Sequence, residues 1–99
     1  MQRENRRQER TQSDAVAKVK WLSPSGQVHF GRGRILDHSP GGLRIEYGER
    51  LEPGCYIVVD APELGSSPRA GWASVRHCAQ KKTKYIIGLE LGASGRWNC

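Results

Sequence analysis

The stretch that decides the fold is "RILDHSPGGLRIEY", residues 34–47. Both of its ends are apolar runs, and between them stand an acid, a hydroxyl, a proline and two glycines. Asp and Ser side chains often bond nearby backbone N–H groups, Pro fixes one φ angle, and Gly tolerates positive φ. The segment 37–42 is therefore predicted to be a tight turn between two strands, and such a turn needs no further purpose.

Apolar and polar residues alternate with a period of two in six short segments, which predicts six strands. They cover about residues 15–22, 27–36, 43–47, 55–60, 70–78 and 85–91. In the second segment Val28 and Phe30 share one parity and Ile35 has the other, so a bulge permitted by Gly31 or Gly33 is expected. No helical period lies between the segments. The pattern predicts an all-β antiparallel barrel or sandwich, and closure into a barrel would remove exposed strand edges.

Composition limits the size of the domain, its location and the charge of its partners. With 99 residues, of which 36% are hydrophobic, one domain with a small core is expected. No apolar run approaches the roughly 18 residues of a membrane span, and the polar beginning of the chain lacks the apolar centre of a signal peptide, so a cytoplasmic location is expected. The three cysteines show no CxxC spacing, and we expect reduced thiols. Sixteen Lys and Arg against ten Asp and Glu give a formal net charge of +6, which favours an anionic partner.

Composition also divides the chain into three parts. Residues 1–14 are polar and rich in arginine, so they are expected to form a flexible basic segment outside the core. Residues 15–91 hold the predicted strands, and the glycine-rich residues 92–99 are expected to be a tail.

The arginines of the first part have a regular spacing. Arg6 and Arg10 stand four residues apart, and Arg3 and Arg7 repeat that interval. Like charges at this interval disfavour a helix. They are better tolerated around an anion, although a solvated basic tail is the simpler interpretation.

Together, the arginines and the turn resemble a known signature, RxxxR followed at a distance by DxSxxG. Here "RRQER" occupies residues 6–10, and "DHSPGG" begins 27 positions after Arg10. This signature is typical of the PilZ domain, the bacterial receptor module for cyclic di-GMP. The later segments "LEPGCYIVV" and "YIIGLEL" add to the resemblance, which covers about residues 6–91. It implies a PilZ-like six-stranded antiparallel β-barrel of the split-barrel type.

The resemblance also implies a function and a set of site residues. The chain would be a cyclic di-GMP receptor or adaptor and not an enzyme. Arg6 and Arg10 would capture guanine bases and phosphates, because a planar guanidinium can chelate both and can stack on a base. Asp37 would accept hydrogen bonds from guanine N1–H and N2–H2, Ser39 would bond at the same rim, and Gly42 would allow a close backbone approach. Accessory contacts are expected from Arg7, Trp72 and Arg76, where Trp72 is either a core residue or a stacking platform.

A mobile arginine segment suggests a mechanism. Ligand binding would fold the segment against the barrel and present a new surface to a protein effector partner. Beyond the ligand itself no cofactor and no metal are expected.

Two other functions stay open. One is a small basic barrel that binds single-stranded nucleic acid through stacking aromatics and a positive groove. Against it, the seven aromatic residues are scattered, and Phe30, Tyr47 and Tyr85 have the parities of core positions. The other is a PilZ adaptor that binds no ligand. Hydrolase chemistry is not expected, because Asp37, His38 and Ser39 cannot take up triad geometry merely by being neighbours.

Overall fold

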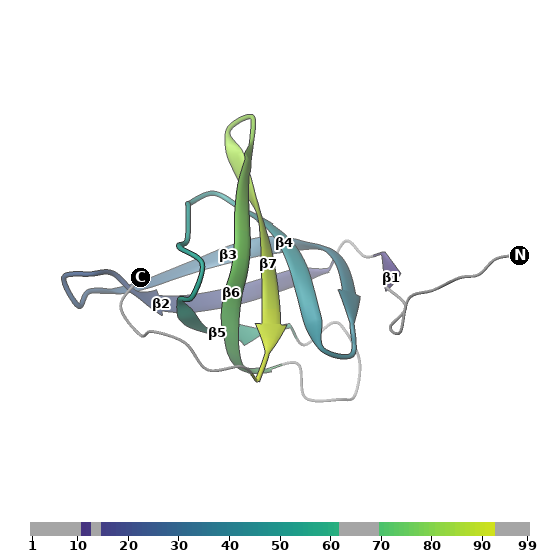
Figure 1. Cartoon of the computed structure of the whole chain (residues 1–99), viewed down its shortest axis with the longest axis horizontal. Coiled ribbons are helices and arrows are strands. Elements are labelled where there is room, and N and C mark those ends of the chain that lie inside the picture. Colours follow the sequence, from purple (N-terminus) through teal and green to yellow (C-terminus); the bar gives the residue numbers. More distant parts are fainter. Residues whose placement is uncertain (1–10, 13–14, 62–69, 93–99) are drawn as a thin grey trace, which may run out of the picture.

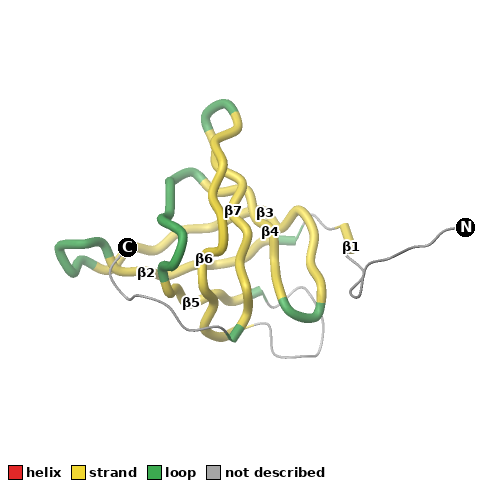
Figure 2. Tube along the Cα trace, viewed as in Figure 1, coloured by secondary structure: helices red, strands yellow, loops and turns green. Residues whose placement is uncertain are grey.

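The structure, a computed structural model, describes residues 11–12, 15–61 and 70–92. It contains seven strands. They are β1 (Thr11–Gln12), β2 (Val16–Leu22), β3 (Val28–Ser39), β4 (Gly42–Tyr47), β5 (Tyr56–Asp60), β6 (Ala70–Lys81) and β7 (Lys84–Leu91). The described residues contain no helix (Figure 2).

Six of the strands form a closed barrel (Figure 1). Their order is β3-β2-β5-β6-β7-β4, and a further pairing between β3 and β4 closes the ring. Every pairing is antiparallel. The prediction of an all-β, six-stranded antiparallel barrel is therefore confirmed. The short strand β1 pairs with the C-terminal end of β3, beyond Arg34, which pairs with the first residue of β2.

The core fills the barrel with side chains from all six strands and from the connections that hold Leu51, Cys55 and Ala61. Its largest fully buried members are aliphatic: Ile35, Leu43, Ile45, Leu51, Ile57 and Ile87. Tyr47 is buried among them and accepts a hydrogen bond from Trp21 Nε1 at 3.1 Å, so its hydroxyl is paired inside the barrel. The expectation that Tyr47 lies in the core is confirmed, and Tyr85 packs against the core half-buried.

Turn chemistry explains two of the connections. The "SPSG" segment turns β2 into β3, and Gly26 takes up a φ of +90° there. At the "EPGC" segment, Cys55 N donates to Glu52 O at 3.1 Å, and Gly54 has a φ of +92°. Proline followed by a left-handed glycine is the arrangement that a type II turn requires.

The predicted bulge near Gly31 and Gly33 is wrong. The pairing of β2 with β3 runs without interruption from Val16↔Arg34 to Leu22↔Val28. Gly31 is needed instead because a Cβ there would collide with the ring of Tyr47. Val28 and Phe30 lie on the outer face of the barrel, with Phe30 75% exposed, so the core position assigned to Phe30 is also wrong. Apolar residues of β3 point to both faces of the barrel, so parity among them does not identify the core face.

Two other expectations are corrected. Strand β6 continues to Lys81, beyond the predicted end near residue 78, so the connection to β7 is a short turn at Lys82 and Thr83. Figure 1 shows this hairpin extending well beyond the rest of the barrel. Cys55 is buried and disulfide-bonded, so reduced thiols were the wrong expectation at that position, whereas Cys78 is free. No helix in the described part of the chain is long and apolar enough to cross a membrane.

Candidate functional site

The DxSxxG segment is the tip of the β3–β4 hairpin. Only Pro40 and Gly41 form the turn, since Ser39 already pairs with Gly42 across the two strands. The predicted tight turn is thus present but shorter than expected, with Asp37 and Ser39 in strand β3. The turn is held to the barrel because Leu91 N, at the end of β7, donates to Gly41 O at 2.9 Å.

A β-bulge sets the direction of the motif side chains. Ile35 stands opposite Ile45, but the next pair is Asp37 opposite Arg44, so Leu36 is the extra residue of β3. Residues that stand opposite each other in an antiparallel pair share a face. Ile35 and Ile45 point into the core, whereas Asp37 shares the outer face with the exposed Arg44. The bulge therefore turns the motif away from the core, a common role of bulges beside binding sites.

Asp37 forms an ion pair with Arg44. The Arg44 Nη2 and Nε atoms lie 2.6 Å and 2.9 Å from the same carboxylate oxygen, Oδ2. Asp37 is only 5% exposed, while about half of the Arg44 side chain is open to solvent. A buried carboxylate needs such donors, because an unpaired charge would be costly to bury. Arg44 thus holds the Asp37 carboxylate in a fixed orientation.

Sequence reasoning missed Arg44, although the spacing contained the signal. A two-residue turn at positions 40 and 41 pairs 39 with 42, 38 with 43 and 37 with 44. Counting outward from "PG" would have placed an arginine directly opposite the aspartate of the motif.

Gly42 has a packing role within the protein. A Cβ atom at this position would lie 2.6 Å from the main-chain oxygen of Leu89 on β7. Real Cβ atoms do not approach a carbonyl so closely, so glycine lets β4 lie tightly against β7. Ser39, opposite Gly42, is 7% exposed.

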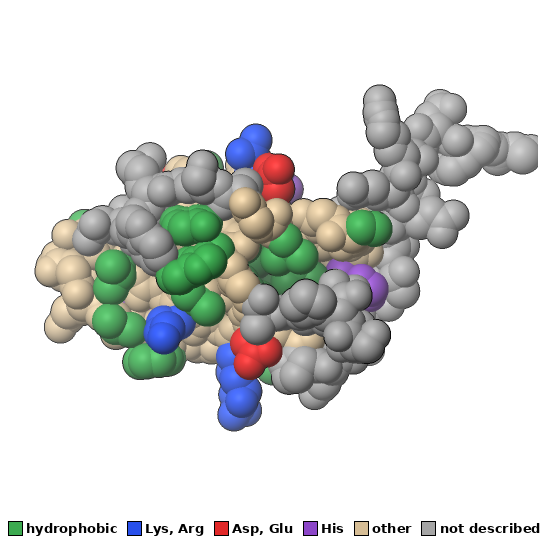
Figure 3. Space-filling model, turned by 90° about the horizontal axis from the view of Figure 1, so that it is seen from below, with side chains coloured by type: hydrophobic (Ala, Val, Ile, Leu, Met, Phe, Trp, Pro, Cys, Tyr) green, Lys and Arg blue, Asp and Glu red, His purple; other side chains and the backbone are tan. Residues whose placement is uncertain are grey.

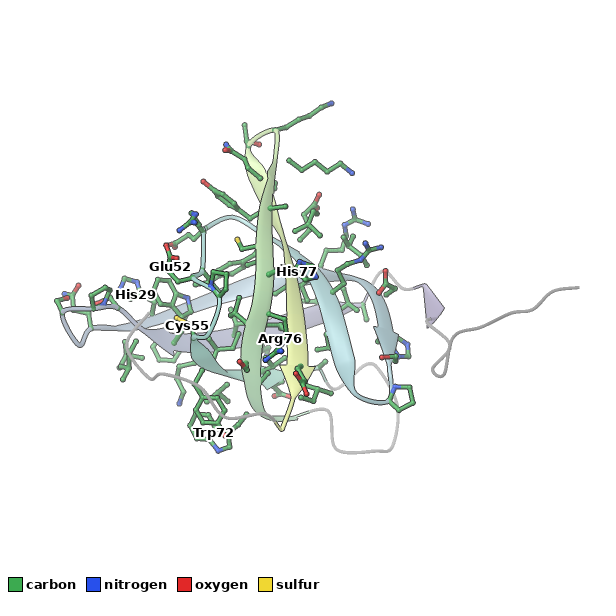
Figure 4. The ribbon with its side chains drawn as sticks, viewed as in Figure 1. His29, Glu52, Cys55, Trp72, Arg76 and His77 are labelled. Carbon is green, nitrogen blue, oxygen red and sulfur yellow. The ribbon has the colours of Figure 1, made fainter. Side chains whose placement is uncertain are left out.

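The other predicted site residues fall into two groups. Arg6, Arg7 and Arg10 lie outside the described residues. Trp72 and Arg76 are both on β6, on the outer face of the barrel (Figure 4). Arg76 Nε forms an ion pair with Glu90 at 3.2 Å, and Glu90 stands directly opposite Gly42. Strand β7 therefore lies between Arg76 and the motif.

Trp72 lies apart from the motif and outside the core. It is 42% exposed and stacks on Tyr56, with ring centroids 5.0 Å apart and an angle of 22° between the planes. The core alternative for Trp72 is wrong. Phe30, Tyr56 and Trp72 all face outward, so the aromatic residues are less scattered than the sequence indicated. These three outward rings form the kind of aromatic surface that the scattered sequence positions did not indicate.

Strand β1 brings the beginning of the described chain to the same hairpin. Thr11 pairs with His38 and Gln12 with Asp37. The segment that follows Arg10 in the sequence is thus bonded to the strand that carries Asp37 and Ser39. Within the described part of the chain, no three His, Cys, Asp or Glu side chains gather as metal ligands would.

Comparison with known proteins supports the fold. No family model matches the chain, and neither does any curated protein. Among solved structures, the chain is similar to YcgR from Escherichia coli, crystallised in complex with c-di-GMP. The TM-score is 0.54 and the sequence identity 17%, over 88% of this chain and 38% of that one. At this identity the likeness shows the shared barrel fold, and this chain spans well under half the length of YcgR.

Proposed function

We propose that this protein is a PilZ-like receptor that binds cyclic di-GMP at the β3–β4 hairpin, between the DxSxxG motif and the arginines of RxxxR. The observation that carries the proposal is the pairing of β1 with β3 at His38 and Asp37. Thr11 directly follows Arg10 in the sequence, so this pairing supports a site shared by the RxxxR arginines, Asp37 and Ser39. In this proposal the two halves of the signature, 27 residues apart, serve one site.

The chemistry of the residues suits a cyclic dinucleotide. Its two phosphates and the O6 and N7 acceptors of guanine are the groups that a guanidinium recognises best, which is the role we assign to Arg6 and Arg10. Asp37 reads the opposite edge of the base. An ionised carboxylate has about four lone-pair sites, so it can accept from guanine N1–H and N2–H2 in addition to the Arg44 donors. Adenine lacks this donor pair, so Asp37 discriminates against it.

Arg44 and Gly42 support the site from the protein side. Arg44 fixes the carboxylate of Asp37 in one orientation before any ligand arrives, which lowers the ordering cost of binding. Gly42 keeps the hairpin tip close to β7. The similarity to YcgR, whose structure contains c-di-GMP, adds weight to the choice of ligand.

In this proposal, signalling depends on the contacts that residues 1–10 gain when the ligand binds. When Arg6 and Arg10 close on the nucleotide, residues 1–10 gain fixed contacts with the hairpin and form a new surface for a protein partner. The protein acts as a receptor or adaptor and performs no chemistry on the ligand.

Calorimetric titration with cyclic di-GMP, beside GTP and cyclic di-AMP, tests the proposal. We expect micromolar affinity, which corresponds to about −8 kcal/mol, for cyclic di-GMP alone among the three. Arg10→Ala should weaken binding by about tenfold or more, the loss of one or two charge-assisted hydrogen bonds. Arg3→Ala makes the same charge change outside the signature and should leave affinity almost unchanged. Equal affinity for cyclic di-AMP, or equal losses in the two variants, would contradict the assignment.

A further inference from the structure

An apolar groove crosses the outer face of β2, β3, β5 and β6. The pairing registers place Phe30 opposite Lys20, Lys20 opposite Val58, and Val58 opposite Trp72, which gives one continuous row over the four strands. Leu22, Val28 and Tyr56 extend the row, and the hollow that they enclose has a volume of about 450 Å³. This volume can hold one or two large side chains.

The groove exposes more apolar surface than a solvated barrel face needs. Phe30 is 75% exposed, Val28 51% and Trp72 42%. Figure 3 shows hydrophobic side chains gathered on the face seen from below, with lysine or arginine side chains among them. Contiguous apolar surface of this kind marks an interaction site more often than a free surface.

The border of the groove is basic. On the other side of Phe30 lies a second hollow, lined by Lys18, Gly31 and Arg32. Lys18 and Arg32 stand opposite each other, and Lys20 Nζ lies 5.9 Å from the centre of the Phe30 ring. Among the described residues of these rows, Asp60 is the only acid, opposite Lys18. Phe30 is thus a ridge between the apolar groove and a second hollow that Lys18 and Arg32 border.

We infer that this face docks a segment of a partner protein in which a large apolar side chain is flanked by carboxylates. The apolar anchor fills the groove between Phe30 and Trp72, where its burial supplies most of the affinity. Its acidic neighbours meet Lys18, Lys20 and Arg32, which fix the register and speed the encounter.

The chemistry of the lining favours a protein over the other occupants. Leu22, Val28 and Val58 offer branched aliphatic surface, whereas single-stranded nucleic acid is held mainly by stacking on open aromatic faces. A second copy of this chain would bring the same cations face to face, because a two-fold interface joins identical patches.

The docking face is separate from the nucleotide site. Phe30 and Asp37 are seven residues apart on β3, about 23 Å at the usual rise of a strand. The inference therefore holds or fails without reference to cyclic di-GMP. It adds the surface by which a receptor of this kind would meet its partner.

Short synthetic peptides test the inference. They are added at millimolar concentration to the full chain without nucleotide, and binding is followed by the chemical shifts of the protein's amides. The probe carries Trp-Leu between glutamates. One control replaces Trp-Leu by Ser-Gly, a second replaces the glutamates by lysines, and an oligothymidylate is the nucleic-acid control. We expect the probe to shift the amides of Lys20, Phe30 and Trp72 at saturable concentrations, and the controls to shift them little.

Variants locate the interaction. Phe30→Ser removes an exposed side chain, so the barrel should stay folded while affinity for the probe falls about tenfold or more. The double variant Lys18→Glu, Arg32→Glu should weaken binding similarly. Lys81→Glu with Lys84→Glu makes the same charge change on the β6–β7 hairpin and should have little effect. Absence of shifts with the probe, stronger shifts with the oligothymidylate, or equal losses in the two double variants would each overturn the inference.

Discussion

Arg44 donates from two nitrogen atoms to a single oxygen of Asp37, and the pair is created by a hairpin whose turn has only two residues. The aspartate of the motif is therefore already oriented before a ligand is present. The turn, the bulge at Leu36 and the ion pair form one local unit, in which each depends on the spacing of the others. This unit is the part of the proposed site that the structure describes.

Removal of Arg44 should damage both stability and binding. In Arg44→Met the buried carboxylate loses two donors, and we expect unfolding to become easier by about 1–2 kcal/mol, less than for a fully buried pair because half of Arg44 is exposed. Urea unfolding of Arg44→Met, Asp37→Asn and the double variant measures the coupling. Additive losses in this cycle would show that the pair contributes nothing.

Gly42 should tolerate no side chain. Gly42→Ala places a Cβ 2.6 Å from the main-chain oxygen of Leu89, so β4 must move away from β7, at a cost of about 1–3 kcal/mol. Gly48→Ala is a matched control, because the space around Gly48 is open and its φ is not positive. Thermal unfolding should give a clearly lower Tm for Gly42→Ala alone. Equal Tm values for the two variants would contradict the packing role of Gly42.

Tyr47 should make the barrel sensitive to alkaline pH. Burial raises the pKa of the Tyr47 hydroxyl above its ordinary value of 10.0, assisted by the charge of Glu49 and opposed by the hydrogen bond from Trp21. The unfolded chain therefore releases this proton at a lower pH than the folded one. The stability contributed by neutral Tyr47 is complete below pH 10 and is lost as the pH rises from there through the folded pKa.

Tyr47→Phe removes this titration. In urea unfolding at pH 8 and pH 11, the variant should lose less stability between the two values than the original chain does. At pH 8 it should be less stable by about 1 kcal/mol, since Trp21 Nε1 loses its acceptor. Identical pH dependence in both chains would show that Tyr47 does not titrate in this way.

Lys82 is the place where a substitution should stabilise the fold. It has a φ of +58°, a left-handed conformation that L side chains adopt at a cost of about 1–2 kcal/mol. Lys82→Gly relieves this strain but adds freedom to the unfolded chain, so we expect a net gain of about 0.5–1 kcal/mol. Lys84→Gly, in a strand, should instead destabilise the hairpin. A loss of stability in Lys82→Gly would contradict the strain argument.

Much of the fold could be predicted because local signals agreed with each other. The alternation around Val19 and Ile45, the Pro-Gly turns and the absence of helical periods all favoured one antiparallel barrel. Phe30 and Trp72 were harder to place, since period-two alternation separates two faces without saying which face is the core. Both are apolar, yet they lie on the outer face of the barrel, where they line the groove.

The site was predictable only in part. Asp37, Ser39 and Gly42 lie on one hairpin because they are close in sequence, and their role in ligand binding stays a prediction. The role of Arg44 depends on a register that becomes visible only after the turn is known to have two residues. The pairing of β1 with β3 joins residues far apart in the chain, and no strand period or turn residue in the sequence predicts its register.

The central claim is that Arg6 or Arg10 and the Asp37–Ser39 segment bind the same nucleotide. A crystal structure of the full chain with saturating cyclic di-GMP tests it most directly. The account predicts one ligand within hydrogen-bonding distance of an RxxxR guanidinium and of Asp37 or Ser39. A nucleotide bound elsewhere on the barrel, or held by only one of these two elements, would contradict it.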